Sequence, residues 1–350
     1  MPSKVGKLQQ WWTKVSHFEF WPFTLFYLPV FIYYGYLALK SRSFFFFTAS
    51  NPSIELGGMM GEKKSDIFEL IPPAYIPKTR LFSPDVSVAT IEHFLQETGV
   101  SFPIIAKPDI GDRGWMVEKI STASALRSYL ERVEVDFLVQ EYVPYPLELG
   151  IFYIRQPDED LGQVTSIVQK GFLSVTGDGQ HTVTQLLQQN VRAMLQADFE
   201  SAGLQAIGST IPTVGEKIEI EAIGNHCRGT TFYNAGHWIT PELSATIDKV
   251  AQQIEGFYFG RFDLRCSSIE DLVAGRNFKI LELNGAGAEP GHIYQPGFSL
   301  RTAYRDVLWH LKMLQKVSVA NKRRGYDYWN FSAGWKKLQE VRQYNQRRSA

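Results

Sequence analysis

Cysteine is nearly missing from this sequence of 350 residues, and the motifs that depend on it are missing too. The two cysteines, Cys227 and Cys266, lie far apart and have neither CxxC nor HxxxH spacing around them. A structural zinc site and a disulfide framework are therefore not indicated, and a reducing compartment is the default. The sequence also lacks internal repeats and any Ser/His/Asp or Cys/His arrangement for nucleophilic catalysis. With 44% hydrophobic and 21% charged residues it is an ordinary globular chain.

A net charge is absent as well, because 36 basic residues balance 36 acidic ones. The two signs are segregated, however. Residues 1–42 carry five basic residues against one acidic residue (+4), and residues 318–350 carry eight against two (+6), so the rest of the chain sums to −10. An acidic body with basic ends suits contact with an anionic surface such as a membrane, and no nucleic-acid partner is expected. For the C-terminal end, a solvated helical face is the alternative to lipid contact.

The N-terminal region contains a long apolar run, residues 20–39, FWPFTLFYLPVFIYYGYLAL. A helix of that length reaches roughly 30 Å, about one hydrocarbon core. Its prolines and aromatic residues fit a membrane span, an interfacial or hairpin insertion, and a buried helix, so all three interpretations stay open. A cleaved signal peptide is disfavoured by the length of the run and by Lys40 and Arg42 after it. These two residues favour the cytoplasmic side.

Beyond this run the pattern predicts alternating helices and strands. Helices are expected near 66–70, 88–98, 122–132, 183–202, 241–256 and 300–316. Strands are expected in a short apolar segment at 43–48 and at 103–108, 137–143, 149–155, 164–170, 216–223, 259–266 and 278–284. The connections within 137–170 are short, which predicts antiparallel pairing.

A first candidate motif is FPIIAKPDIGDRGWMVEKI, residues 102–120. A strand ends at Lys107, and a loop with Gly111 and Gly114 follows. Phosphate groups are bound by such loops, because backbone N–H groups can approach closely while an ammonium supplies charge. The motif is not a Walker A sequence, and a hairpin with a solvent-facing lysine is the alternative.

A second candidate is LVQEYVPYPLELGIFYI, residues 138–154. Glu141 and Glu148 bracket a proline-containing bend. An extended bend offers backbone groups to an adenine ring, and a carboxylate binds ribose hydroxyls. Two surface glutamates are the alternative.

The third candidate combines Asp263 in GRFDLR with Glu282 and Asn284 in ILELNGAG. Glu282 and Asn284 alternate onto one face of their strand, and an adjacent strand would bring Asp263 to the same side. Hard oxygen ligands of this kind suit Mg²⁺, which bridges to substrate phosphates. A structural salt bridge from Asp263 to Arg261 or Arg265 is the alternative.

In this order the three motifs resemble the ATP-grasp superfamily, specifically its D-alanine–D-alanine ligase-like carboxylate–amine ligases, over roughly residues 60–315. The segments KGFLSVTGDGQHTVTQLL and IGNHCRGTTF look like the corresponding region of cyanophycin-synthetase-type ligases. The resemblance implies an α+β fold in which two α/β subdomains grip ATP. It also implies four regions: a basic and apolar membrane-associated segment (1–42), a reduced pre-ATP-grasp region (43–75), the ATP-grasp domain (76–317) and a basic tail (318–350).

The resemblance also implies a role for each matching residue. Lys107 would contact the α- and β-phosphates of ATP and act in catalysis, and Lys64 would be the second phosphate lysine, with Lys63 competing for that role. The loop from Asp109 to Gly114 would close over the triphosphate. The other implied roles are loop contacts for Gly111, Arg113 and Gly114; the adenine hinge for Glu141, Tyr142 and Val143; ribose binding for Glu148; ligation of two Mg²⁺ ions, or of Mn²⁺, for Asp263, Glu282 and Asn284; and stabilisation of the transferring phosphoryl group for Arg261.

The implied reaction activates a carboxylate as an acyl phosphate, which an amine attacks to give an amide and ADP. Positioning and charge neutralisation dominate such chemistry, which agrees with the missing nucleophile motifs. The sequence departs from D-alanine ligases in its short N-terminal region and in its acceptor loop, so D-alanine as substrate is in doubt. Candidate acceptor residues are Gly285, Gly287, Glu289, His292 and Arg228, with a satisfied loop histidine and a surface arginine as the alternatives for the last two.

We therefore expect an ATP- and Mg²⁺-dependent carboxylate–amine ligase at the cytoplasmic face of a membrane. Its substrates would be small amino acids or peptides. One alternative keeps the fold and adds an amino acid to a larger peptide or polymer. The other is an ATP-binding membrane adaptor whose catalysis has decayed. Sequence does not fix the oligomeric state.

Overall fold

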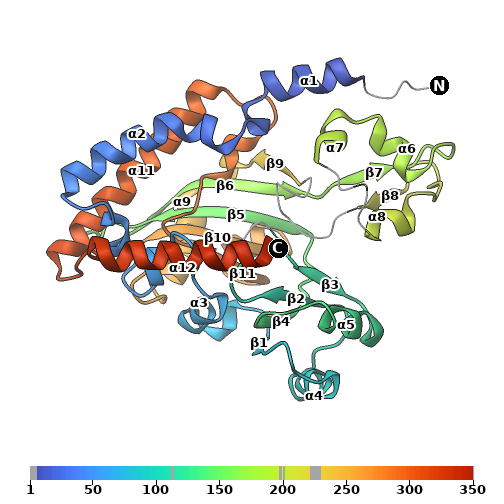
Figure 1. Cartoon of the computed structure of the whole chain (residues 1–350), viewed down its shortest axis with the longest axis horizontal. Helices are drawn as coiled ribbons and strands as arrows, with labels where there is room; N and C mark the ends of the chain where they lie inside the picture. The colour runs from blue at the N-terminus through green and yellow to red at the C-terminus, as the bar shows by residue number, and fades with distance from the viewer. Residues whose placement is uncertain (1–5, 112–113, 197–198, 200–201, 221–229, 350) are drawn as a thin grey trace.

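Two antiparallel sheets and the helices around them form the framework of the protein (Figure 1). The computed structural model describes residues 6–111, 114–196, 199, 202–220 and 230–349. A four-stranded sheet has the order β1-β4-β2-β3, a five-stranded sheet has the order β11-β10-β5-β6-β9, and β7 pairs with β8. The strands are β1 (Thr79–Phe82), β2 (Ile104–Pro108), β3 (Glu118–Ile120), β4 (Phe137–Glu141), β5 (Leu147–Ile154), β6 (Gln163–Gly171), β7 (Ser174–Thr176), β8 (Lys217–Glu219), β9 (Thr231–Asn234), β10 (Phe259–Cys266) and β11 (Phe278–Asn284).

The helices lie at both ends of the chain and over the sheets. The α-helices are α1 (Lys7–Ser16), α2 (Phe23–Ser41), α3 (Lys64–Leu70), α4 (Val88–Thr98), α5 (Ala123–Leu130), α6 (Val183–Gln188), α7 (Val191–Gln196), α8 (Ala202–Ile207), α9 (Pro241–Ala251), α10 (Ile269–Val273), α11 (Leu300–Arg323) and α12 (Phe331–Ser349). Short 3₁₀ helices are η1 (Phe18–Phe20), η2 (Phe46–Ala49), η3 (Glu55–Gly58), η4 (Pro73–Tyr75), η6 (Gly236–Trp238) and η7 (Gly291–Tyr294).

The four-stranded sheet is covered on one face by α4 and α5 (Figure 1). Both helices begin where the sequence predicts, because a side-chain oxygen caps each N-terminus: Ser87 accepts from the Thr90 N–H, and Thr122 from that of Ala125. Their apolar faces bury Phe94 and Leu126 in one cluster with the sheet. The predicted helices at 88–98 and 122–132 are confirmed.

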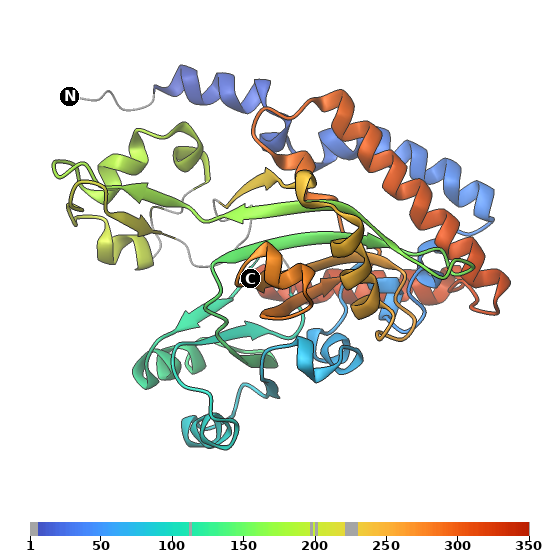
Figure 2. The same ribbon diagram turned by 180° about the vertical axis from the view of Figure 1, so that it is seen from behind.

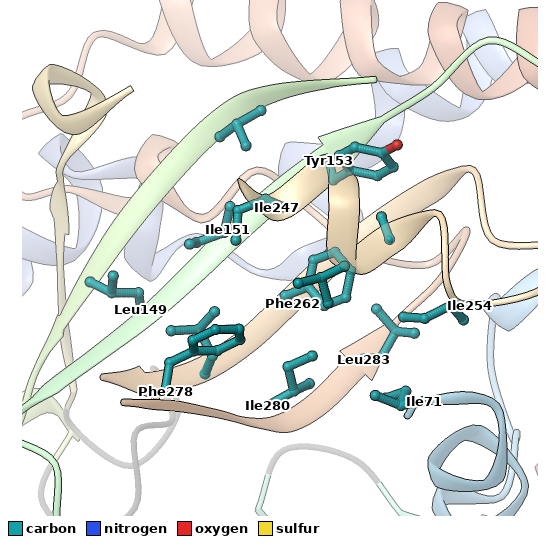
Figure 3. Packing of buried hydrophobic residues seen from close by; sticks show 14 of the residues in the cluster. Ile71, Leu149, Ile151, Tyr153, Ile247, Ile254, Phe262, Phe278, Ile280 and Leu283 are labelled. Atoms are coloured by element: carbon teal, nitrogen blue, oxygen red, sulfur yellow. The ribbon is translucent and has the colours of Figure 1, made fainter. Parts of the chain in front are cut away.

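The five-stranded sheet buries both faces, and the alternation of its strands assigns each residue to one of them. On β5, Leu149, Ile151 and Tyr153 pack against α9 and the neighbouring strands (Figure 3). Phe152 and Ile154 alternate to the other face, which belongs to a separate cluster. On β10, Phe262 and Leu264 share the α9 side. Arg261, Asp263 and Arg265 therefore project from the opposite face.

The apolar run of the N-terminus forms α2, which lies alongside α11 in both views (Figures 1 and 2). Its length and composition would allow it to cross a membrane. The most apolar 18-residue stretch of the helix has a mean hydropathy of 1.2, and 28% of that stretch is buried in the protein. Phe26, Tyr27 and Val30 are among its buried residues. Helix α2 is thus apolar on its outer side as well as on the side that packs against the body, a pattern that a fully soluble surface helix does not require.

The strand predicted near residues 43–48 is wrong. Residues 46–49 form η2 instead, and Phe45, Phe46 and Phe47 are all buried against α11 and β10. A short, continuous apolar run does not by itself distinguish a buried strand from another buried segment, which explains the error. Asn51 fixes this segment, because its side chain bonds to the backbone of Gly57, Tyr258 and Phe259.

Three other predicted elements differ in length from the prediction. The predicted helix at 183–202 is divided among shorter helices that pack with β7 and β8 as a small lobe (Figure 2). The predicted strand at 216–223 is the three-residue β8 within the described residues. Helix α11 continues seven residues beyond Lys316 to Arg323, where Asn321 donates to the carbonyl of Ala49 at 2.8 Å.

His310 on α11 provides a pH-dependent test of this packing. It is buried, and burial lowers the pKa of its imidazole to about 4 from an ordinary 6.5. The unfolded chain therefore binds a proton that the folded chain resists, so stability falls as the pH drops from about 6.5 towards 4, by up to roughly 3 kcal/mol. We expect thermal unfolding of the wild type to show a steeper pH dependence in this window than that of His310→Gln. Equal slopes for the two proteins would contradict the prediction, since the lowered pKa of His310 is the property that the variant removes.

Candidate active site

A cavity of about 890 Å³ lies between the two sheets and extends to the first turn of α2. Its walls include Lys107 from the four-stranded sheet, Asp263 and Glu282 from the five-stranded sheet, and Phe23 from α2. The volume falls near the upper end of the range of about 300–1,000 Å³ for ligand pockets. The three motifs that the sequence singled out therefore meet at one cavity.

Lys107, near the end of β2, connects the two sheets. Its ammonium donates to Oε1 of Gln140 and to the carbonyl of Leu281 on β11, both at 3.0 Å. The ammonium also lies 4.9 Å from the centre of the Phe68 ring. Burial lowers the pKa of Lys107 to about 8, although the charge of Glu282 opposes this shift. Because Lys107 is 6% exposed, the alternative of a solvent-facing lysine is wrong.

Lys64 and the glycine loop lie beside Lys107. The Lys64 ammonium donates to the carbonyl of Gly111 at 2.6 Å and lines the cavity, as Gly111 and Gly114 do. Lys63 is exposed and is not part of the cavity wall. This geometry favours Lys64 over Lys63 as the second phosphate lysine. Arg113, the other predicted loop contact, lies outside the described residues.

Asp109 holds the start of this loop to α3. Its carboxylate accepts from the backbone N–H of Ser65 at 2.8 Å and from the Ser65 hydroxyl at 2.9 Å. The carbonyl of Asp109 in turn accepts from the Lys64 N–H at 3.0 Å. The glycines beyond Asp109 are thus tied to α3 at one end, which places Lys64 against the loop.

The predicted hinge follows β4 and lines the cavity with Glu141, Tyr142 and Val143. The Glu141 carboxylate accepts from the backbone N–H of Lys78 at 3.1 Å. The Tyr142 ring lies between two cations, with Lys119 at 4.1 Å and Arg265 at 5.4 Å from its centre. The carbonyl of Val143 accepts from Arg265 at 2.9 Å. Extended backbone therefore borders the cavity where the sequence predicts adenine contacts.

Glu148 is buried in a charge network rather than exposed, so the interpretation as a surface glutamate is wrong for this residue. Its carboxylate lies 3.2 Å from the Lys170 ammonium and 2.8 Å from Nε of Arg265. Burial alone would lower the pKa of Lys170, but Asp263 and Glu148 raise it. Glu148 lines the cavity. Both of its oxygens already bind cations, so its binding of a ribose stays a prediction.

Asp263 lies in the same network. It accepts from Arg261 through Nε at 2.7 Å and Nη2 at 3.1 Å, and its other close cation is Lys170 at 3.3 Å. Burial alone would raise the pKa of the Asp263 carboxyl, but Arg261 and Lys170 lower it. The salt bridge that was the alternative reading of Asp263 is therefore present, on Arg261. The position of Asp263 on the cavity wall keeps the metal role as a prediction.

Glu282 lies opposite Asp263 in the β10–β11 register, and Asn284 lies opposite Arg261. Nδ2 of Asn284 is 3.5 Å from Oδ2 of Asp263, so the three predicted metal ligands converge. Among the described residues, no hydrogen bond or ion pair engages the Glu282 carboxylate. In the described part of the chain, no three His, Cys, Asp or Glu side chains form a cluster that could hold a metal. Asn284 is not one of these four residue types, so the proposed ligand set is not covered by that statement.

Glu62 adds a carboxylate that sequence reasoning missed. It lines the cavity, its Oε2 atom is buried without a hydrogen-bond partner, and burial and then the charge of Glu282 raise its pKa. A carboxylate whose charge raises the pKa of a buried neighbouring carboxyl favours a bound cation between the two. The donor set of Glu282 and Asn284, with Asp263 adjacent and Glu62 opposite, therefore fits Mg²⁺, a cation that prefers oxygen ligands.

The predicted acceptor residues fall into two groups. Gly287 lines the cavity, whereas Gly285 packs on η3, where a Cβ atom would lie 2.4 Å from the carbonyl oxygen of Gly57. His292 is buried with both ring nitrogens engaged, at 2.7 Å from Oγ of Ser166 and 3.1 Å from Oδ2 of Asp306, and does not line the cavity. This placement agrees with the satisfied loop histidine. Arg228 lies outside the described residues.

Glu289 lies deeper in the acceptor region, between two tyrosines. Tyr27 of α2 donates to one carboxylate oxygen, and Tyr294 donates to the other at 2.6 Å. The carbonyl of Glu289 accepts from Nη1 of Arg261 at 3.1 Å. Burial, and then the charge of Glu289, raises the pKa of both tyrosines, so both remain protonated donors. The sequence placed Glu289 in the acceptor loop but gave no sign that α2 would reach it.

The C-terminal segment also contributes to the cavity. Val341 and Asn345 of α12 line it, and the Tyr344 hydroxyl donates to the carbonyl of Ile110 at 3.1 Å in the glycine loop. Lys337 pairs with Glu55 at 2.8 Å. Helix α12 thus lies across the body beside the nucleotide motifs (Figure 1).

Comparisons with known proteins give similarity at the level of structure. No protein-family model matches the chain, and no curated protein sequence matches it. The D-alanine–D-alanine ligase of Bacillus anthracis is similar with a TM-score of 0.41 and 13% identity, over 75% of this chain and 68% of that ligase. The VanG D-Ala:D-Ser ligase of Enterococcus faecalis has a TM-score of 0.42 and 14% identity, over 75% of this chain and 62% of that ligase.

A bifunctional glutathione synthetase of Pasteurella multocida is similar with a TM-score of 0.35 and 12% identity, over 69% of this chain. This chain spans about a third of that enzyme, with 35% covered. Similarity at these TM-scores carries no argument about what this chain binds or converts. The architecture itself, two sheets with their helices around one cavity, agrees with the two gripping subdomains of the predicted ATP-grasp fold.

Proposed function

We propose that the protein is an ATP-dependent carboxylate–amine ligase. The observation that supports this best is the meeting of Lys107, Arg261 and Glu282 at one cavity, although they come from three strands of two sheets. A cavity that joins an ammonium, a guanidinium and an unengaged carboxylate suits transfer of a phosphoryl group, which depends on positioning and charge neutralisation. ATP and the two substrates occupy the cavity between the sheets.

The proposed reaction has two steps. The donor carboxylate attacks the γ-phosphorus of ATP, and the bond to the β-phosphate oxygen breaks to give an acyl phosphate and ADP. The amine then attacks the acyl carbon, the bond from that carbon to the phosphate oxygen breaks, and an amide and inorganic phosphate form. Starting from a carboxylate, an ammonium and ATP, the products are the amide, ADP, inorganic phosphate and one proton.

The residues of the chain divide this work. Lys107 and Lys64 hold the phosphates, and Arg261 neutralises charge on the transferring group. The backbone from Glu141 to Val143 contacts the base. The loop from Asp109 to Gly114 excludes water from the acyl phosphate, which would otherwise hydrolyse. Mg²⁺, with Mn²⁺ as a substitute, would be held by Glu282, Asn284 and Asp263 and would supply charge for the phosphates.

The purified protein with ATP, Mg²⁺ and hydroxylamine, over a panel of amino acids and short peptides as donors, tests this function. Hydroxylamine converts an acyl phosphate into a hydroxamate without any natural acceptor, so the colour of its iron complex reports the first step alone. We expect a hydroxamate with a limited set of donors. ATP binding without hydroxamate from any donor would instead support the decayed adaptor. Extension of peptides in preference to single amino acids would support the polymer-directed ligase.

We also propose that the protein acts at the cytoplasmic face of a membrane. Helix α2 exposes Leu28, Ile32 and Leu39 at 57%, 70% and 80%. Its other side packs against α11, and Tyr27 enters the cavity. These lateral contacts with the body favour a helix that lies in the interface over one that crosses the bilayer. The basic residues of both chain ends would add attraction to anionic lipids.

The membrane proposal predicts loss of vesicle binding when the outer face of α2 becomes polar. We expect the triple variant Leu28→Ser/Ile32→Ser/Leu39→Ser to partition into phosphatidylglycerol–phosphatidylcholine vesicles at least about 100-fold less well at high salt, because each buried apolar side chain contributes about 1.5–3 kcal/mol and salt screens the basic ends. The control changes Leu161, Ile211 and Val214, which are 72%, 53% and 81% exposed on other parts of the body, to serine. Equal sedimentation of both triple variants would contradict the proposal.

A further inference from the structure

The cavity has a second end whose lining differs from that of the nucleotide end. Five aromatic residues of the segment from η1 to α2 line it: Phe18, Trp21, Phe23, Phe26 and Tyr27. Phe23 stacks on Tyr27 with ring centres 4.3 Å apart, and Phe18 stacks on Phe26 at 5.2 Å. Such a wall offers a large apolar contact area and suits neither a phosphate nor a small, fully polar amino acid.

A carboxylate marks the inner limit of this aromatic wall. Glu289 accepts hydrogen bonds from Tyr27 and Tyr294, and all three residues line the same cavity. Among the described residues, the Glu289 carboxylate forms no ion pair, although the charge of Arg261, which donates to the Glu289 carbonyl, acts on it. An anionic oxygen pair with two neutral donors retains lone pairs for a further donor, and an ammonium matches that charge.

The aromatic wall continues onto the outer surface of the protein. Phe23 lines the cavity and is also 52% exposed. On α2 the apolar exposure continues through Phe31, which is 50% exposed and whose ring centre lies 6.1 Å from that of Phe23. A ligand held at Glu289 and lying along these aromatic rings therefore reaches exposed apolar side chains of α2, in a lining to which Glu19 also belongs. Phe31 lies three residues from Leu28, at the edge of the outer face of α2 that we assign to lipid.

We propose that the amine acceptor of the ligase is an amphiphile, with a primary ammonium held at Glu289 and an alkyl portion lying along the aromatic wall toward the exposed face of α2. This inference rests on the proposed ligase function for its chemistry. The nitrogen loses one proton before it attacks the acyl carbon and a second as the amide forms. Glu289 accepts the first and passes it to water, and the second leaves directly to solvent or phosphate. The chain thereby joins a water-soluble carboxylate to a membrane-embedded amine.

A series of primary n-alkylamines from ethylamine to decylamine, used below their critical micelle concentrations, tests the acceptor class. The reactive group is constant in this series and the apolar length changes. With the donor identified by the hydroxamate assay, we expect kcat/KM to rise at least about 100-fold from ethylamine to decylamine, since each buried methylene contributes to binding. Equal kcat/KM along the series, with a positive hydroxamate assay, would overturn the amphiphile and leave the ligase standing.

Direct binding separates the two proposals if the hydroxamate assay is negative. Saturable decylamine binding, followed by calorimetry, supports the amine site even when no donor is activated, in which case the ligase function falls. Absence of decylamine binding by the folded wild type overturns the site. Two variants locate it: Phe23→Ser should weaken decylamine binding roughly 10-fold or more, and Glu289→Gln should weaken it by removing the charge.

A matched control distinguishes the cavity wall from the lipid-facing surface. Leu28→Ser makes the same exposed face of α2 more polar, but Leu28 does not line the cavity. It should bind decylamine as the wild type does. Loss of binding in Leu28→Ser equal to that in Phe23→Ser would overturn the assignment, because the amine would then be partitioning onto the surface of α2.

Discussion

Lys107→Met should lower kcat/KM for ATP by about 100- to 1,000-fold, the range found when one preorganised donor to a developing charge is removed. Methionine keeps most of the apolar side chain and removes the ammonium, which lies 4.9 Å from the centre of the Phe68 ring. The variant should remain folded, because burial already disfavours the charged form of Lys107. Hydroxamate production over a range of ATP concentrations measures the effect, and thermal unfolding checks the fold.

Lys63→Met is the matched control for this experiment. Lys63 is adjacent in sequence to the proposed phosphate lysine Lys64, yet it is exposed and not part of the cavity wall. It should keep a KM for ATP close to that of the wild type. A folded Lys107→Met protein with wild-type turnover would remove Lys107 from the phosphate site. An equal loss in both variants would indicate a general effect of charge rather than a contact.

The sequence predicts which of the candidate side chains share a face, because that follows from strand alternation. Because side chains alternate along a strand, Glu282 and Asn284 had to share a face, and Asp263 joins them once β10 pairs with β11. The same rule places Lys107 at the end of a strand, before a glycine loop. These are local properties, and they survive folding because both strands are buried on their other side by the α9 cluster.

The partners of those residues could not be predicted in the same way. Lys170 belongs to a strand that the sequence identifies, but its contacts with Glu148 and Asp263 depend on the order of β10, β5 and β6 in the sheet. Tyr27 reaches Glu289 across 262 positions of sequence. Such contacts arise from the arrangement of elements in space, and no spacing along the chain encodes them. The sequence does indicate the face on which Lys170 lies, because Ser166, Val168 and Lys170 are spaced by two residues on β6 and therefore share one face.

The apolar run illustrates a different limit. Hydropathy and length describe α2 correctly as a helix that a membrane would accept. They do not reveal that one side of it packs on α11 through Phe26, whose ring stacks on Tyr304 at 5.1 Å. Composition therefore describes how apolar a segment is, but it does not predict whether the segment crosses a membrane. Crossing also depends on whether the rest of the protein packs against the helix.

Two substitutions of neighbouring carboxylates should have opposite balances of stability and activity. Asp263→Asn leaves the guanidinium of Arg261 and the ammonium of Lys170 in a buried network that has lost a charge. Removal of one partner from a buried ion pair costs about 3–5 kcal/mol. We expect the melting temperature of this variant to fall by several degrees, as measured by differential scanning calorimetry without ligands.

Glu282→Gln should lower the melting temperature less than Asp263→Asn does, because Glu282 forms no ion pair among the described residues and its repulsion of Glu62 offsets its longer-range attraction to Lys107. Its activity should nevertheless fall at least about 100-fold if it holds Mg²⁺, and the concentration of Mg²⁺ that protects the ATP-bound protein against unfolding should rise. A stability loss in Glu282→Gln as large as that in Asp263→Asn would mean that Glu282 belongs to the structural network. Full stability of Asp263→Asn would mean that the buried pairs with Arg261 and Lys170 contribute nothing to folding, and would leave metal binding as the sole reason for a carboxylate at that position.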